Sequence, residues 1–88
     1  MGVHQDIRWL KNNKDRADLF VLVAKRGPAR VRELREFLGS DDWWPVKVHI
    51  KDMVDRALIE ETEDGFKTTD SGEKVFESLK AVYDIESV

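Results

Sequence analysis

The segment from residue 44 to residue 51 combines an indole ring, two lysines and an aliphatic side chain at intervals of one to four residues. In a helix, Trp44, Val48, Lys51 and Asp55 would lie near the centre of one face, and Lys47 and His49 would flank it. Lys47 can reach a guanine edge and Val48 a thymine methyl group, whereas Lys51 is better placed for a phosphate. The alternative interpretation is an ordinary solvated helix face that happens to carry two lysines.

A second basic group lies upstream and consists of Arg30, Arg32 and Arg35. Arg32 and Arg35 are three residues apart, so a helix would present them on one face. Arginines grouped in this way can contact phosphates. Glu33 and Glu36 stand between them, so a solvated surface of Arg–Glu pairs is an equal alternative.

The segment 60–64 is acidic, with a single base, Lys67, close to it; its carboxylates are Glu60, Glu61, Glu63 and Asp64. Carboxylates repel a phosphate backbone, so this segment either stays clear of a nucleic acid or meets a protein. The helical angle places Trp44 outward and lets Trp43 lean inward. An exposed Trp44 can pack on a sugar–phosphate edge or anchor a protein interface.

No residue pattern predicts a metal site, a cofactor or a catalytic residue. The chain has no Cys, and His4 and His49 are its two histidines, which is too few ligands for a typical zinc site. We expect His49 to be partly buried with one nitrogen satisfied, and donation to a phosphate is the alternative. The glycines form no phosphate-binding loop, and the serines lie outside any nucleophile–base pattern. We therefore expect a protein that is not an enzyme.

The length of 88 residues predicts one domain, and the net charge of −3 averages two unlike halves. Residues 1–38 carry nine Lys or Arg against five Asp or Glu, whereas residues 39–88 carry six against thirteen. A nucleic-acid binder needs a basic face and not a basic average, so this balance keeps that function open. The lack of Cys and of any apolar run long enough for a bilayer favours a cytoplasmic protein without a membrane partner.

Hydrophobic periodicity and turn residues predict helices over 3–11, 14–26, 31–38 and 45–57, strands over 58–62 and 66–68, and a last helix after the N-cap Thr69. Gly27-Pro28 should end the second helix, with Gly27 as a left-handed cap, and residues 39–42 should form a turn. Pro45 suits a first helical position. The predicted inward positions are Leu19, Phe20, Val23, Ala24, Val31, Leu34, Phe37, Leu38, Val46, Ile50, Met53, Val54, Ala57, Val75, Phe76, Leu79, Val82 and Tyr83.

Four segments carry a resemblance to a known family: GPARVREL at 27–34, Ala57-Leu58-Ile59, the turn at Asp64-Gly65, and Thr69-Asp70-Ser71-Gly72. Over residues 14–80 the chain resembles the winged helix-turn-helix proteins of the MarR, ArsR and PadR type. The resemblance implies a mainly α fold with a small β-hairpin (α+β), in which a three-helix core and a wing are flanked by N- and C-terminal helices. Residues 1–88 would form this single domain, with residues 1–12 as a helical extension.

The resemblance also implies a dimer that binds double-stranded DNA. The helix over 45–57 would enter the major groove, the helix over 31–38 would lie across the backbone, and the wing would approach an adjacent backbone or minor groove. We therefore predict a DNA-binding transcriptional regulator. The alternative is a winged-helix protein–protein interaction module within a larger assembly, which the acidic segment 60–64 and Trp44 support.

The two ends of the chain carry apolar stripes beyond those that the three-helix core needs. The first stripe contains Val3, Ile7 and Leu10, with Trp9 beside them, and the second lies on the last helix. We expect these terminal segments to pack together, either within one chain or across the two-fold axis of a homodimer.

Overall fold

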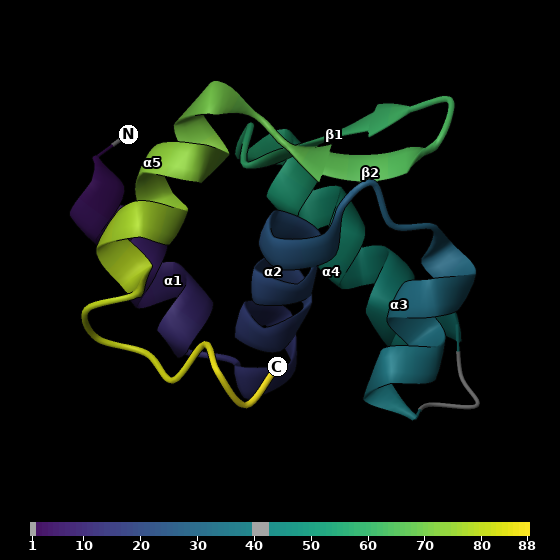
Figure 1. Ribbon diagram of the computed structural model, residues 1–88, viewed down its shortest axis with the longest axis horizontal. Coiled ribbons are helices and arrows are strands. Elements are labelled where there is room, and N and C mark those ends of the chain that lie inside the picture. The colour runs from purple at the N-terminus through teal and green to yellow at the C-terminus, as the bar shows by residue number, and fades with distance from the viewer. Residues whose placement is uncertain (1, 40–42) are drawn as a thin grey trace.

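Figure 1 shows the computed structural model of the chain, which describes residues 2–39 and 43–88, without the side chain of residue 43. Its elements are α1 (Val3–Lys11), α2 (Lys14–Arg26), α3 (Val31–Leu38), α4 (Trp43–Asp55), β1 (Ile59–Thr62), β2 (Gly65–Thr68) and α5 (Asp70–Leu79). This order confirms the predicted mainly α fold with a small hairpin. The inward orientation predicted for Trp43, and the predicted turn beyond Gly39, lie outside the described residues.

Helix α2 lies at the centre of the fold and contacts α1, α3, α5 and β2 (Figure 1). Seven consecutive residues, 17–23, are buried along it, so the helix is covered on every side. Its start is capped, because the side-chain oxygen of Asn13 accepts a hydrogen bond from the Arg16 amide at 3.1 Å. Phe20 meets Phe76 of α5 edge to face, with ring centroids 6.4 Å apart.

The end of α2 differs from the prediction. Gly27 has φ −61° and ψ 154°, which is extended backbone and not a left-handed cap. Glycine is required there for space, because a Cβ atom would lie 2.5 Å from the Val23 carbonyl oxygen. The chain then pairs Ala29 with Phe66 of β2 through two backbone hydrogen bonds of 2.7 and 2.8 Å. The loop after α2 is thereby attached to the hairpin.

Helices α3 and α4 pack against each other as the two helices of a helix-turn-helix. The core side of this pair is formed by Leu34, Val46, Ile50 and Met53, all buried. Helix α4 begins at Trp43, two residues before the predicted start, because a proline at position 45 still lies in the first turn, where its missing N–H needs no partner.

Three side chains of α3, α4 and the turn after α4 that were predicted to point inward are exposed: Phe37 by 38%, Val54 by 40%, and Ala57. Val46, Ile50 and Met53 already fill the narrow inward stripe of α4, which leaves Val54 at its edge. Ala57 lies beyond the end of the helix with φ 60°, where the chain turns towards β1. The predicted stripes were therefore wider than the faces that the fold buries.

Strands β1 and β2 form an antiparallel hairpin in which Ile59 pairs with Thr68 and Thr62 with Gly65. Ile59 and Phe66 are buried, whereas the acidic side chains point into solvent. The hairpin leads to α5, whose first turn is capped as predicted. The Thr69 hydroxyl accepts a hydrogen bond from the Gly72 amide at 2.9 Å.

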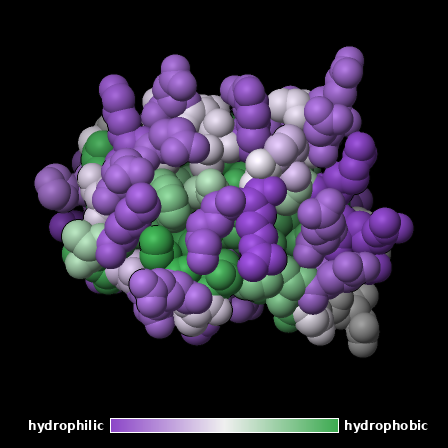
Figure 2. Space-filling view, viewed as in Figure 1, coloured by the Kyte–Doolittle hydropathy of each residue, from purple (hydrophilic) through white to green (hydrophobic). Residues whose placement is uncertain are grey.

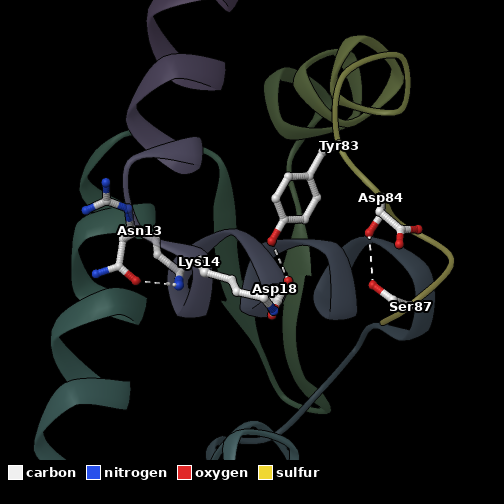
Figure 3. A network of polar contacts seen from close by, with 7 residues as sticks. Asn13, Lys14, Asp18, Tyr83, Asp84 and Ser87 are labelled. Carbon is white, nitrogen blue, oxygen red and sulfur yellow. Dashed lines mark hydrogen bonds and ion pairs between the residues drawn. The ribbon is translucent and has the colours of Figure 1, made fainter.

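Helix α5 ends at Leu79, so Val82 and Tyr83 do not continue its stripe as predicted. Val82 is 51% exposed. The Tyr83 hydroxyl donates to Asp18 of α2 at 2.6 Å, and the Lys14 ammonium group contacts the same carboxylate at 2.6 Å (Figure 3). Burial, and then this hydrogen bond, raise the pKa of Tyr83. The segment after α5 is therefore held against α2 by a polar contact.

The terminal helices α1 and α5 pack together within one chain, which is one of the two arrangements predicted for them (Figure 1). Leu10 and Leu79 are fully buried in the resulting layer. Among the residues that the structure describes, we find no helix with the length and apolarity needed to cross a membrane.

Candidate nucleic-acid interface

The outer side of α4 carries the side chains that the sequence analysis placed there. We call it the α4 face and define it as Trp44, Lys47, Val48, Lys51 and Asp55; all five are exposed. Trp44 is 72% exposed and Val48 37%. The buried Val46, Ile50 and Met53 anchor the opposite side of the same helix. The α4 face is therefore a rigid, convex surface of the size that a major groove admits.

A carboxylate lies inside this surface beside one of its two lysines. The Lys51 ammonium group contacts Asp55 at 2.8 Å, and the two side chains are 75% and 59% exposed. The hydrogen bond to Asp55 raises the pKa of Lys51, so the lysine stays charged. The Asp55 carboxylate partly cancels the electrostatic field of the Lys51 ammonium group at longer range. Helical spacing places Asp55 on this face, but its pairing with Lys51 was not predicted from the sequence.

His49 lies at the edge of the α4 face and is half-buried, as expected. Its Nδ1 atom is buried without a hydrogen-bond partner, so the expectation of one satisfied nitrogen stays a prediction that concerns Nε2. Burial, and then the nearby Arg16 charge, lower the pKa of His49. His49 therefore adds no positive charge to the face near neutral pH. No group of three metal-ligating side chains occurs among the described residues.

The three arginines predicted to contact phosphates lie on or beside α3, but in different surroundings. Arg30 is the N-cap residue of α3, and its guanidinium donates to the Glu63 carbonyl oxygen at 3.5 Å. Arg32 is exposed and Arg35 is half-buried. Because α3 packs against α4, the arginines and the α4 face belong to adjoining helices. Arg30 is turned towards the hairpin, which the sequence did not predict.

The hairpin presents an acidic surface, as its sequence indicates. We call it the acidic hairpin and define it as Glu60, Glu61, Glu63 and Asp64, all of which are exposed. Lys67 is the cross-strand partner of Glu60, and its ammonium group lies 3.7 Å from that carboxylate. The base beside the acidic hairpin is thus itself partly neutralised.

A polar cluster between α1 and the end of α4 was missed by the sequence analysis. The guanidinium groups of Arg16 and Arg56 lie over the Trp9 ring, with their central carbons 3.8 and 4.2 Å from its centroid. Arg16 also donates to the Trp9 carbonyl oxygen, and Arg56 contacts the buried Asp6 at 3.0 Å. One signal was present in the sequence: Asp6 shares the inward face of its helix with Val3 and Leu10, and a carboxylate there needs a partner.

Comparison with solved structures shows that the fold is similar to that of the activation domain of MotA, a transcription factor of phage T4. The TM-score is 0.74, and the match covers 98% of this chain and 94% of that domain at 20% sequence identity. Neither protein-family models nor curated proteins give a match. The resemblance to MarR, ArsR and PadR proteins stays a prediction. What the likeness shows is the fold: this chain has the winged-helix-like architecture found in a transcription factor domain.

Proposed function

We propose that the chain binds double-stranded DNA and regulates transcription in the cytoplasm, with α4 inserted into the major groove. The architecture supports the proposal, since it is shared with a domain of a transcription factor. The residues support it independently, because the α4 face combines Lys47 and Lys51 with an indole and an aliphatic group. In this arrangement Lys47 and Val48 read base edges, Lys51 contacts a phosphate, and Trp44 packs on the backbone.

The observation that carries the proposal is the exposure of the α4 face. A helix that only filled the core would not need an indole that is 72% exposed beside two exposed lysines. Arg32 and Arg35 on α3 extend the basic surface towards the adjoining backbone. Arg30 is turned towards the hairpin, so it would have to leave the Glu63 carbonyl oxygen to contact a phosphate at the outer edge of this surface.

The acidic hairpin limits how the domain can approach a duplex. Its four carboxylates would face phosphates if the hairpin lay along the backbone, as a basic wing does. The proposed complex therefore places α3 and α4 on the DNA and leaves the acidic hairpin pointing away from it.

The test is fluorescence anisotropy of a labelled mixed-sequence duplex, titrated with protein at about 50 and 200 mM salt. We expect Kd to rise steeply with salt. Lys51→Ala should weaken binding to all duplexes by about threefold, whereas Lys47→Ala should alter the preference among sequences. Lys74→Ala on α5 is the matched control, since it removes an exposed lysine outside the site. A folded protein that does not bind at low salt, or a control that behaves as Lys51→Ala does, would refute the proposal.

A second candidate function is a protein–protein interaction within a larger assembly. The exposed indole of Trp44 and the acidic hairpin favour it, because an aromatic anchor with a charged rim is a common interface pattern. In this case Trp44→Ala should abolish capture of a cellular partner while duplex binding is weak from the start. Retention of every partner by this variant would remove the candidate.

A homodimer, in which two copies double the phosphate contacts, is proposed with the DNA-binding function. Because α1 and α5 cover each other within one chain, a dimer through these terminal helices would use their outer surface. Light scattering at tens of micromolar tests it, and a monomeric mass would exclude it at that concentration.

A further inference from the structure

A groove lies between α1 and the segment that follows α5, away from the α4 face. Its volume is about 570 Å³, and it is lined by His4, Ile7, Arg8, Lys11, Asn12 and Val82. We call it the basic groove. Figure 2 shows apolar surface between polar side chains in the half of the molecule that α1 and α5 occupy.

The basic side chains of this groove share one face of α1. His4, Arg8 and Lys11 are separated by four and three residues, which is the spacing of helix neighbours. All three are exposed, and within the described chain Arg8 and Lys11 form no ion pair and donate no side-chain hydrogen bond. Lys14, one turn further along the chain, is by contrast paired with Asp18 at 2.6 Å. Two fixed positive charges thus point into the groove without an internal counter-charge.

Apolar side chains lie between these charges. Ile7 packs partly against the core, and Val82 is 51% exposed, more than any other large aliphatic side chain in the described part of the protein. A bound group that covers Val82 and Ile7 would remove apolar surface from water while its charges meet Arg8 and Lys11.

From this juxtaposition we propose that the basic groove binds an acidic amphipathic helix of a partner protein. Carboxylates one helical turn apart would meet Arg8 and Lys11, and an aliphatic side chain between them would cover Ile7 and Val82. The apolar groups of a duplex are thymine methyls inside the major groove, and a recessed groove on this protein cannot enter it to bring Val82 against them. A bilayer would need a basic surface broader than the two fixed positive charges of this groove. This proposal does not rest on the proposed DNA binding, since the groove shares no residue with the α4 face.

The test uses a capped, fluorescein-labelled peptide of about 16 residues, long enough to form a helix, with Glu and Leu side by side on one face. Its binding to the full chain is followed by anisotropy. Lys11→Glu should weaken binding by about fivefold, because an attraction becomes a repulsion at an exposed site. Val82→Ser should weaken it by about threefold through lost apolar contact. Lys74→Glu is the matched control for the charge change and should have an effect below about twofold.

Two further comparisons make the experiment decisive. The variant with both Arg8→Glu and Lys11→Glu should lose the acidic peptide and gain binding to a peptide with Lys in place of Glu. Far-UV circular dichroism checks that each variant is folded. The proposal is overturned if the peptide does not bind the wild-type protein, if Lys74→Glu weakens binding as much as Lys11→Glu, or if Val82→Ser has no effect. It is also overturned if a mixed-sequence duplex or phosphatidylserine vesicles, but not the peptide, depend on Lys11.

Discussion

Gly72 allows α5 to approach the start of the hairpin, and its substitution tests how tightly these elements pack. A Cβ atom at this position would lie 2.0 Å from the carbonyl oxygen of Leu58 and 3.0 Å from its carbonyl carbon. The same oxygen accepts a hydrogen bond from the Thr69 amide at 3.1 Å. Both atoms that Gly72→Ala would strike belong to the backbone, so no side chain can rotate away. The helix itself must move.

The free-energy change can be worked out from these contacts. Ordinary contact begins at 3.4 Å, so α5 must retreat by about 1.4 Å. Strain of this kind costs about 1–3 kcal/mol, and weakening the hydrogen bond to Leu58 adds about 1 kcal/mol. Alanine stabilises a helix by about 1 kcal/mol relative to glycine. We therefore expect Gly72→Ala to lower the free energy of unfolding by about 2 kcal/mol, or the melting temperature by about 10 °C in a domain of this size.

Urea unfolding followed by far-UV circular dichroism measures this change, and two other glycines provide controls. Gly2→Ala should cost at most about 0.5 kcal/mol, through the N-cap preference for glycine alone, because a Cβ atom there meets nothing within 4 Å. Gly39→Ala should cost about 1 kcal/mol through its φ of +67° alone, since the surrounding space is open. If Gly72→Ala is as stable as the wild-type protein, α5 does not lie against Leu58 as described and the reasoning fails.

Three further predictions concern single polar side chains. Burial lowers the pKa of His49 from 6.5, so the unfolded state binds the proton more readily and the free energy of unfolding falls as the pH drops below 6.5. His49→Gln should flatten this decline when the free energy of unfolding is measured by urea titration at several pH values. An unchanged dependence on pH would contradict the burial. Tyr83→Phe should lower the free energy of unfolding by about 1–2 kcal/mol, because it removes the hydrogen bond to Asp18; urea unfolding measures this, and no change would mean that water replaces the bond. Asp55→Asn should tighten duplex binding by about threefold in the anisotropy assay, since it removes the acid beside Lys51; weaker binding would show that the pair instead positions the lysine.

Local signals in the sequence were sufficient to predict most element boundaries. Asn13 and Thr69 cap their helices with side-chain hydrogen bonds, and such caps depend only on residues within one turn. The start of α4 was predicted too late because proline is compatible with several positions of a first turn. The exposure of Trp44 and Lys51 also followed from helical spacing, since the angle between side chains on one helix is a local property.

Contacts between distant parts of the chain could not be predicted in the same way. The ion pair of Asp6 with Arg56 and the hydrogen bond of Tyr83 to Asp18 join residues 50 and 65 positions apart. No local pattern specifies which partner a buried carboxylate will meet. The DNA contacts of the α4 face stay a prediction for a related reason, since exposure shows that a side chain can be reached but not what reaches it.

The cluster around Trp9 has a practical consequence for anyone who trims this domain for expression. Residues 1–12 were predicted to be an extension of a winged helix that begins near residue 14. Removing them would strip Leu10 from the core and leave Arg56 without the carboxylate of Asp6. The end of α4, which presents Lys51, would then lose its support. A shortened chain that binds DNA poorly would therefore report a damaged fold and not a missing DNA contact.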